Sequence, residues 1–249
     1  MSDAIDNQSA RDRIVRQVRG ALEFETRVNL HRYPIHIDYL DDQTILLEGE
    51  VESVAAKRIA LERAGAIPGP RGVVDRLKVV AARPMGDGEI RDAVRDALVG
   101  ELALSECAIA IRDAGALKTV RHAAKDSPYL IEIAVDDGTV TLDGRVRSLE
   151  QKRLAGVLAW WVPGTRDVVN GLEVFPEQED NDGEITDAVR AVLEKDKLLD
   201  AGQIRVSTRN AVVTLDGLVL DERQREMAEA DAWYVFGVND VINRLEVRE

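Results

Sequence analysis

Several features that define protein classes are scarce or absent in this sequence of 249 residues. The single cysteine, Cys107, excludes an internal disulfide and a zinc site built from several thiolates. Aromatic residues make up only 4% of the chain, too few for a broad surface that stacks on single-stranded nucleic acid. No apolar run approaches the roughly 20 residues that span a bilayer. The chain nevertheless has 45% hydrophobic residues, enough to build folded cores.

Charge is abundant and mostly negative. The formal net charge is −13, from 33 basic and 46 acidic residues, and the acidic excess falls in residues 85–249. This balance argues against nucleic-acid binding, because phosphate is met by Lys and Arg, and it weakens attraction to anionic lipids. The first residues also lack the apolar segment of a secretory signal. The sequence therefore predicts a cytoplasmic protein.

One pattern of landmarks occurs three times along the chain. A glycine in a short turn is followed by a second glycine after 20 residues, an apolar pair after 24 and 25, a leucine after 28 and a valine after 30. Such agreement without a gap indicates an internal repeat. Glycine in the turn is typical of a bulge or a tight strand exit, although it also permits close approach of a ligand. The turn glycines are Gly49, Gly144 and Gly217, and the second glycines are Gly69, Gly164 and Gly237.

Each copy predicts the element order α-β-β-α-β. An amphipathic helix precedes two short alternating strands joined by an Asx- or Gly-containing turn, and a second helix begins after a Ser or Asp cap. A last strand closes the copy. The predicted fold class is α+β, with three tandem small α-β-β-α-β modules, each a three-stranded sheet covered by two helices. The predicted caps are Ser53, Ser148 and Asp221, and the predicted last strands are 73–79, 168–174 and 241–247.

Two linkers rich in Pro, Gly and acidic residues divide the chain. The predicted modules are 10–81, 88–176 and 183–249, and packing of the modules on one another is expected because each is small. The middle module carries about twenty extra residues, near 105–127, relative to the other two copies. We expect this insertion to form a loop or an added element at an edge, and to be dispensable for the fold of its module.

The repeated motif resembles the BON domain. The pattern V-T-L-x-G-x-V followed by G-x-x-D-V-[VI]-N-x-L-x-V is clear within 140–174 and 213–247, and looser within 45–79. This resemblance implies a non-enzymatic bacterial protein associated with osmotic and envelope stress. It also implies binding of phospholipid, a partner protein, a small ligand or potassium, as proposed for members of the family, many of which are periplasmic.

Residues suited to catalysis or metal binding are sparse. The three histidines, His31, His36 and His122, lack the spacing of metal ligands, and Cys107 lies in an apolar stretch that is typical of a buried thiol. The acidic pairs Asp41–Asp42 and Asp136–Asp137 lie where hairpin turns are predicted, and the third copy has Arg209–Asn210 there instead. The sequence therefore predicts no enzyme activity, no cofactor and no metal site.

Two aromatic pairs occupy the same place, late in the second helix of their modules. They are Trp160–Trp161 and Trp233–Tyr234, and the first module has Gly65–Ala66 there instead. At about 100° per residue, these rings lie off the stripe that faces the module's own core. Two interpretations are open: the rings pack against the neighbouring module or the insertion, or they form an interaction surface for an external partner or a lipid.

The sequence as a whole predicts a non-enzymatic tandem BON-domain binding or scaffold protein, stress-associated, that acts through protein or envelope interactions. Its partner would be an unknown protein or a lipid surface, and not nucleic acid. One alternative is a sensor of a small ligand or a cation such as potassium. Another alternative is a peripheral phospholipid-binding protein.

Overall fold

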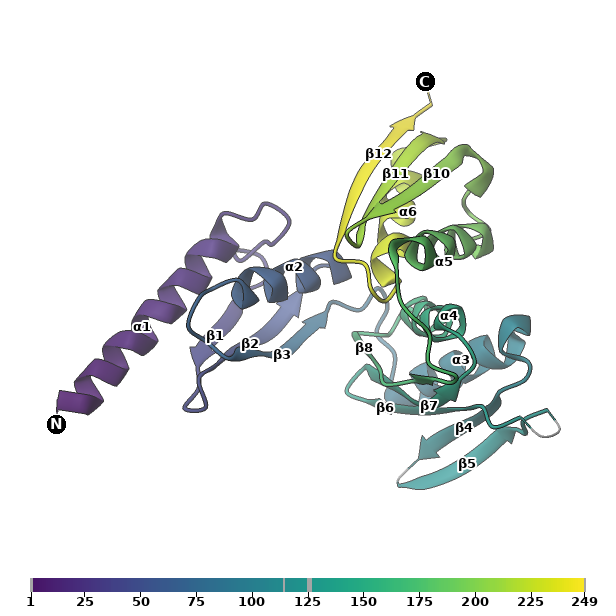
Figure 1. Cartoon of the computed structure of the whole chain (residues 1–249), viewed down its shortest axis with the longest axis horizontal. Coiled ribbons are helices and arrows are strands. Elements are labelled where there is room, and N and C mark those ends of the chain that lie inside the picture. The colour runs from purple at the N-terminus through teal and green to yellow at the C-terminus, as the bar shows by residue number, and fades with distance from the viewer. Residues whose placement is uncertain (1, 114, 125–126, 249) are drawn as a thin grey trace. The chain divides into compact units, whose positions relative to one another are not determined.

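The computed structural model describes residues 2–113, 115–124 and 127–248, with side chains of the first helix from residue 10 onward. The chain forms two compact units that divide between Val80 and Ala81 (Figure 1). The first unit holds one module, and the second unit holds the other two. The α+β class and the tandem repetition of small α-β-β-α-β modules are confirmed.

The first unit has the predicted order. Its sheet has the order β1-β2-β3, with β1 antiparallel to β2 and β2 parallel to β3. Ser53 caps the second helix by accepting a hydrogen bond from the backbone N–H of Ala56 at 3.1 Å. Apolar residues of both helices and the sheet fill the core, among them Val18, Leu47 and Leu77. The elements are α1 (Ser2–Glu23), β1 (Ile35–Tyr39), β2 (Thr44–Val51), α2 (Val54–Gly65) and β3 (Gly72–Val79).

The third module repeats this topology within the second unit. Strand β10 is antiparallel to β11, and β11 is parallel to β12. Asp221 caps the second helix of the module by accepting from the backbone N–H of Gln224 at 2.9 Å. The elements are α5 (Asp182–Lys195), the 3₁₀ helix η2 (Ala201–Gln203), β10 (Ile204–Arg209), β11 (Val212–Val219), α6 (Glu222–Tyr234) and β12 (Asp240–Val247).

The second module departs from the predicted three strands, because its sheet has six. The sheet has the order β5-β4-β6-β7-β8, and β9 also pairs with β7. The insertion supplies β4 and β5, and the predicted last strand is divided into two short ones. The elements are α3 (Asp87–Gly100), the 3₁₀ helix η1 (Leu102–Leu104), β4 (Ala108–Asp113), β5 (Ala116–Arg121), β6 (Leu130–Asp136), β7 (Thr139–Val146), α4 (Leu149–Trp160), β8 (Asp167–Asn170) and β9 (Glu173–Val174).

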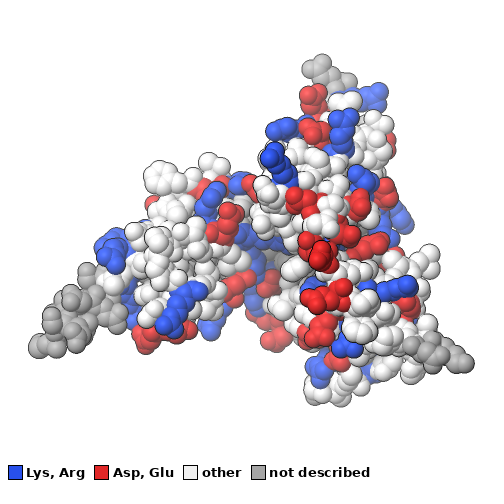
Figure 2. All heavy atoms as spheres, in the orientation of Figure 1, with Lys and Arg blue, Asp and Glu red and all other residues white. Residues whose placement is uncertain are grey.

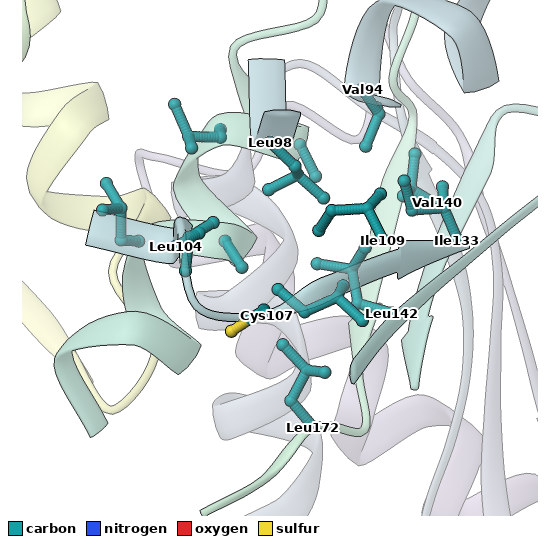
Figure 3. Close-up of a cluster of buried hydrophobic side chains, with 14 of the residues drawn as sticks. Val94, Leu98, Leu104, Cys107, Ile109, Ile133, Val140, Leu142 and Leu172 are labelled. Atoms are coloured by element: carbon teal, nitrogen blue, oxygen red, sulfur yellow. The ribbon is translucent and has the colours of Figure 1, made fainter. Parts of the chain in front are cut away.

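The insertion contributes to the core of the second module, which corrects the expectation that it is dispensable. Strand β4 runs parallel to β6, so that alternate apolar side chains point toward the helices. Cys107 and Ile109 are fully buried in one cluster with Leu98 of α3 and Leu142 of β7 (Figure 3). The guanidinium of Arg121, in β5, donates to the backbone carbonyls of η1 and of the turn that precedes β4. We therefore expect the fold of this module to depend on the insertion.

Candidate interaction site between the second and third modules

Helix α4 is buried on nearly all sides, unlike a helix that covers one sheet. Ala155 and Ala159 face the core of the second module, whereas Val157 is buried without belonging to that core. The outer side of α4 contacts α5 and α6 of the third module (Figure 1). A helix with buried residues on opposite sides requires such cover on both of them. The buried residues of α4 are Leu149, Gln151, Arg153, Leu154, Ala155, Gly156, Val157, Leu158 and Ala159.

Three of the four helix-end aromatics, Trp160, Trp161 and Tyr234, lie at this contact. The rings of Trp160 and Tyr234 stack across the two modules, with centroids 5.7 Å apart and an interplanar angle of 10°. Trp161 donates a hydrogen bond from its indole Nε1 to a carboxylate oxygen of Asp231 at 2.8 Å. Trp233 is only 1% exposed. The rings of these four residues are therefore stacked, hydrogen-bonded or buried within the second unit. This arrangement agrees with the first of the two interpretations, in which they pack inside the protein.

Arg153 of α4 is a second link between the modules, which the sequence analysis missed. Its guanidinium is 1% exposed, and Nε donates to the backbone carbonyl of Phe236 at 2.9 Å. Its Nη2 donates to Asp180, in the connecting segment, at 2.5 Å. The neighbouring Lys152 places its ammonium 4.8 Å from the centroid of the Phe236 ring. Arg153 follows three other polar residues of α4, so the sequence gave no signal for its burial, which the connecting segment and the third module explain.

Charge pairs offset the acidic surplus at this contact. Figure 2 shows many acidic side chains on the face of the second unit that is in view. Lys195, at the end of α5, donates to both carboxylate oxygens of Glu101 at 3.0 Å, and so joins the third module to the second. Because Glu101 is largely buried, this pair is less screened by solvent than an exposed one.

Asp231 has the most unusual electrostatics of the site. Burial raises the pKa of its carboxyl from 3.8 to about 7, the hydrogen bond from Trp161 opposes the rise, and the neighbouring carboxylate of Asp196 adds to it. Trp161 and Asp196, together with Lys195 and Lys197, line a hollow of about 330 Å³ beside the contact. The protonation of one buried acid is therefore linked to the packing of two modules.

The turn glycines support the strand pairing of each module. Gly49, Gly144 and Gly217 have φ of +142°, +117° and +141°. Each lies opposite the isoleucine that begins or nearly begins the neighbouring strand. A Cβ at Gly217 would lie 2.0 Å from the backbone carbonyl oxygen of Gln203. Close approach of backbone to backbone therefore accounts for glycine here, without a ligand.

The second glycines lie just after the second helices. Gly69 and Gly237 have positive φ of +112° and +96°, whereas Gly164 does not. A Cβ at Gly164 would instead lie 2.6 Å from the Cβ of Met85. The three equivalent positions therefore need glycine for different reasons.

Groups suited to catalysis do not gather in the described part of the chain. Burial raises the pKa of the Cys107 thiol to about 11, which keeps it a poor nucleophile at neutral pH. Among the residues that the structure describes, no three His, Cys, Asp or Glu side chains are grouped as a metal site would need. In the same residues, the structure contains no helix of the length and apolarity that crossing a membrane requires.

Comparison with known proteins identifies the repeat. The model of the BON domain matches residues 10–81, 113–176 and 181–249. The chain belongs to the BON domain family. The second match begins at the end of β4 and thus omits α3, although α3 packs into the core of that BON domain. The resemblance seen in the sequence is therefore confirmed.

One curated relative is an osmotically inducible protein. Osmotically-inducible protein Y of Escherichia coli (strain K12) is 32% identical over 124 residues, which cover 47% of this chain and 62% of that protein. The chain thus matches less than two thirds of the relative's length. Over this part of its length, the chain is similar to a protein that is named for its osmotic induction.

Two solved structures show a remote likeness. The C-terminal domain of CdsD, the structural protein of the type III secretion system of Chlamydia trachomatis, is 12% identical, with a TM-score of 0.25 over 95% of this chain and 98% of that one. The periplasmic domain of PrgH is also 12% identical, with a TM-score of 0.23 over 86% and 95% of the two chains. A likeness at this level carries no argument about the function of this BON-domain protein.

Proposed function

We propose that this BON-domain protein is a non-enzymatic scaffold that acts in stress by binding partner proteins. The observation that carries the proposal is that each of its three sheets has one face against helices and one face toward solvent. In β10, for example, Ile204 and Val206 are buried whereas Arg205 and Ser207 are exposed. Repeating such a module three times offers several binding surfaces on one chain, which raises avidity without new contacts.

The position of the four helix-end aromatic residues supports a protein partner over insertion of these rings into a lipid surface. Insertion into a bilayer needs exposed apolar rings. Trp161 and Asp231 are instead hydrogen-bonded to each other, Trp160 stacks on Tyr234, and Trp233 is buried. The net charge of −13 further weakens attraction to anionic membranes.

Osmotic challenge of cells tests the proposal. In the organism that carries the chain, cells lacking it are compared after an osmotic upshift with cells given back the full chain. We expect the full chain to restore survival and to form in-cell crosslinks to a defined protein partner after the upshift. Co-sedimentation with vesicles in the absence of any protein crosslink would favour the phospholipid alternative. A rise in melting temperature with potassium, again without a crosslink, would favour the sensor alternative.

A further inference from the structure

Strand β4 occupies a place in the second module that is vacant in the other two. The first strand of the repeated motif is β1, β6 or β10, and each pairs in antiparallel fashion with the next strand. In the second module, β4 lies parallel to β6 on its other side. In the described part of the chain, β1 and β10 have no strand on that side and are edge strands. An edge strand presents backbone N–H and C=O groups for pairing with another chain.

The second module shows how such a place is filled. The backbone N–H of Ala108 donates to the carbonyl of Tyr129 at 2.9 Å as the two strands begin to pair. Ile109 and Ile111 then point into the core of the module. On the other face of the sheet, Arg112 of β4 forms an ion pair with Glu132 of β6 at 2.5 Å.

The equivalent edge in the third module is β10. Because Ile131 pairs with Gly144 and Ile204 pairs with Gly217, the two strands correspond residue by residue. Arg205 thus stands where β6 has Glu132, and it is exposed. The carbonyl that corresponds to that of Tyr129 belongs to Gly202.

A hollow lies beside this edge. Its volume is about 560 Å³, and its lining includes Arg190 of α5, Gly202 of η2 and Arg205 of β10. The hollow therefore combines a strand edge with two basic side chains and one acidic one, Asp216 of β11, which lies opposite Arg205. The occupied edge of the second module has an acidic residue, Glu132, where β10 has Arg205.

We propose that the edge of β10 binds an extended segment of a partner protein as an additional parallel strand. The segment would carry apolar residues at two alternate positions, as Ile109 and Ile111 do in β4, and an acidic residue to face Arg205. Backbone hydrogen bonds provide affinity in this mode of recognition, and side chains at alternate positions provide specificity. This inference rests on the proposed function, since it names the kind of partner segment that the scaffold binds.

Charge argues against a second copy of the chain as the occupant. Two β10 strands paired edge to edge would bring Arg205 and Arg209 of one copy near the same residues of the other. Like charges opposite one another destabilise a strand pair. An acidic segment of another protein instead gains from the same two side chains.

The experiment measures binding of two synthetic peptides to the full chain. Both contain residues 108–113 between short Gly-Ser ends; one keeps the native Arg112 and the other carries R112E. Binding is measured by fluorescence anisotropy, and the site is located by hydrogen exchange over the whole chain. We expect the R112E peptide to bind and to protect residues 204–209. We expect the native peptide to bind about tenfold more weakly, because it brings a positive charge to Arg205.

A charge swap tests the pairing of residues. Arg205→Glu should weaken binding of the R112E peptide about tenfold and strengthen that of the native peptide. Arg244→Glu, which changes the net charge equally on β12, on the far side of β11 from β10, is the matched control and should preserve the preference for R112E.

Three outcomes would overturn the inference: no binding of either peptide, protection elsewhere with β10 unchanged, or a dimer in which β10 is already protected. None of these outcomes changes the result of the in-cell crosslinking experiment, on which the proposed function depends. The two proposals can therefore fail independently of each other.

Discussion

The indole Nε1 of Trp161 in α4 donates a hydrogen bond of 2.8 Å to the carboxylate of Asp231 in α6. The two residues are in different BON domains, and Asp231 is only 4% exposed. A buried polar group that loses its partner retains the cost of its desolvation. This bond therefore makes the packing of the second and third modules specific as well as favourable.

Trp161→Phe should destabilise the second unit by about 1–3 kcal/mol, because it leaves the buried Asp231 without this donor. Urea unfolding of the full chain, followed by tryptophan fluorescence, measures the loss. All three tryptophans, at 160, 161 and 233, belong to the second unit, so the signal reports on that unit. Trp160→Phe is the matched control, since it removes an indole that can be replaced by another stacking ring. Equal losses from both substitutions would contradict a special contribution of the hydrogen bond.

Asp231 should make the stability of the second unit depend on pH. Burial, opposed by the Trp161 hydrogen bond and reinforced by Asp196, raises the pKa of the Asp231 carboxyl from 3.8 to about 7. The folded state thus favours the neutral acid. Its stabilising contribution is fully present below pH 3.8, is lost as the pH rises toward 7, and changes no further above that value.

The variant Asp231→Asn isolates this contribution. Asparagine still accepts from Trp161 but does not ionise, so the variant should gain stability relative to the native chain between about pH 4 and 7. The gain should approach about 1.4 kcal/mol per pH unit at its steepest. Urea unfolding at a series of pH values measures it. Parallel pH profiles for the two proteins would show that Asp231 ionises normally in the folded chain.

The stack between Trp160 and Tyr234 should appear as a coupling energy. In a double-mutant cycle with alanine at both positions, we expect a coupling of about 0.5–1.5 kcal/mol, the usual range for aromatic pairs. A second cycle that combines Trp160→Ala with Tyr39→Ala is the control. Tyr39 belongs to the first unit, so its effect should add to that of Trp160. A coupling energy near zero in the first cycle would show that the two rings are not in contact in solution.

The repeated part of the fold was predictable because its signals are local. A hydroxyl or carboxylate at Ser53, Ser148 or Asp221 caps a helix through the nearest backbone N–H groups, whatever lies further away. Strand alternation and the turn glycines are equally local, and comparison of three copies fixed their register.

The insertion and the contact between modules were less predictable. Residues 105–127 have no counterpart in the other copies, so the repeat gave no pattern for β4 and β5. Arg153 and Asp231 are ordinary polar residues of their helices until the neighbouring module buries them. The helix-end aromatics showed that a contact existed, but the sequence left open what they touch.

The contribution of β4 to the core can be measured with one substitution. Ile109→Ala should destabilise the second unit by about 2–5 kcal/mol, because it removes buried methyl groups and leaves a cavity in a packed cluster. Val120→Ala, in the adjoining strand β5, is the matched control. Its side chain is 41% exposed, so the loss should stay within about 0.5 kcal/mol. Urea unfolding of the full chain again gives both values. If Ile109→Ala were as mild as Val120→Ala, the insertion would be an accessory to the fold, and β4 would no longer be a guide to what the edge of β10 binds.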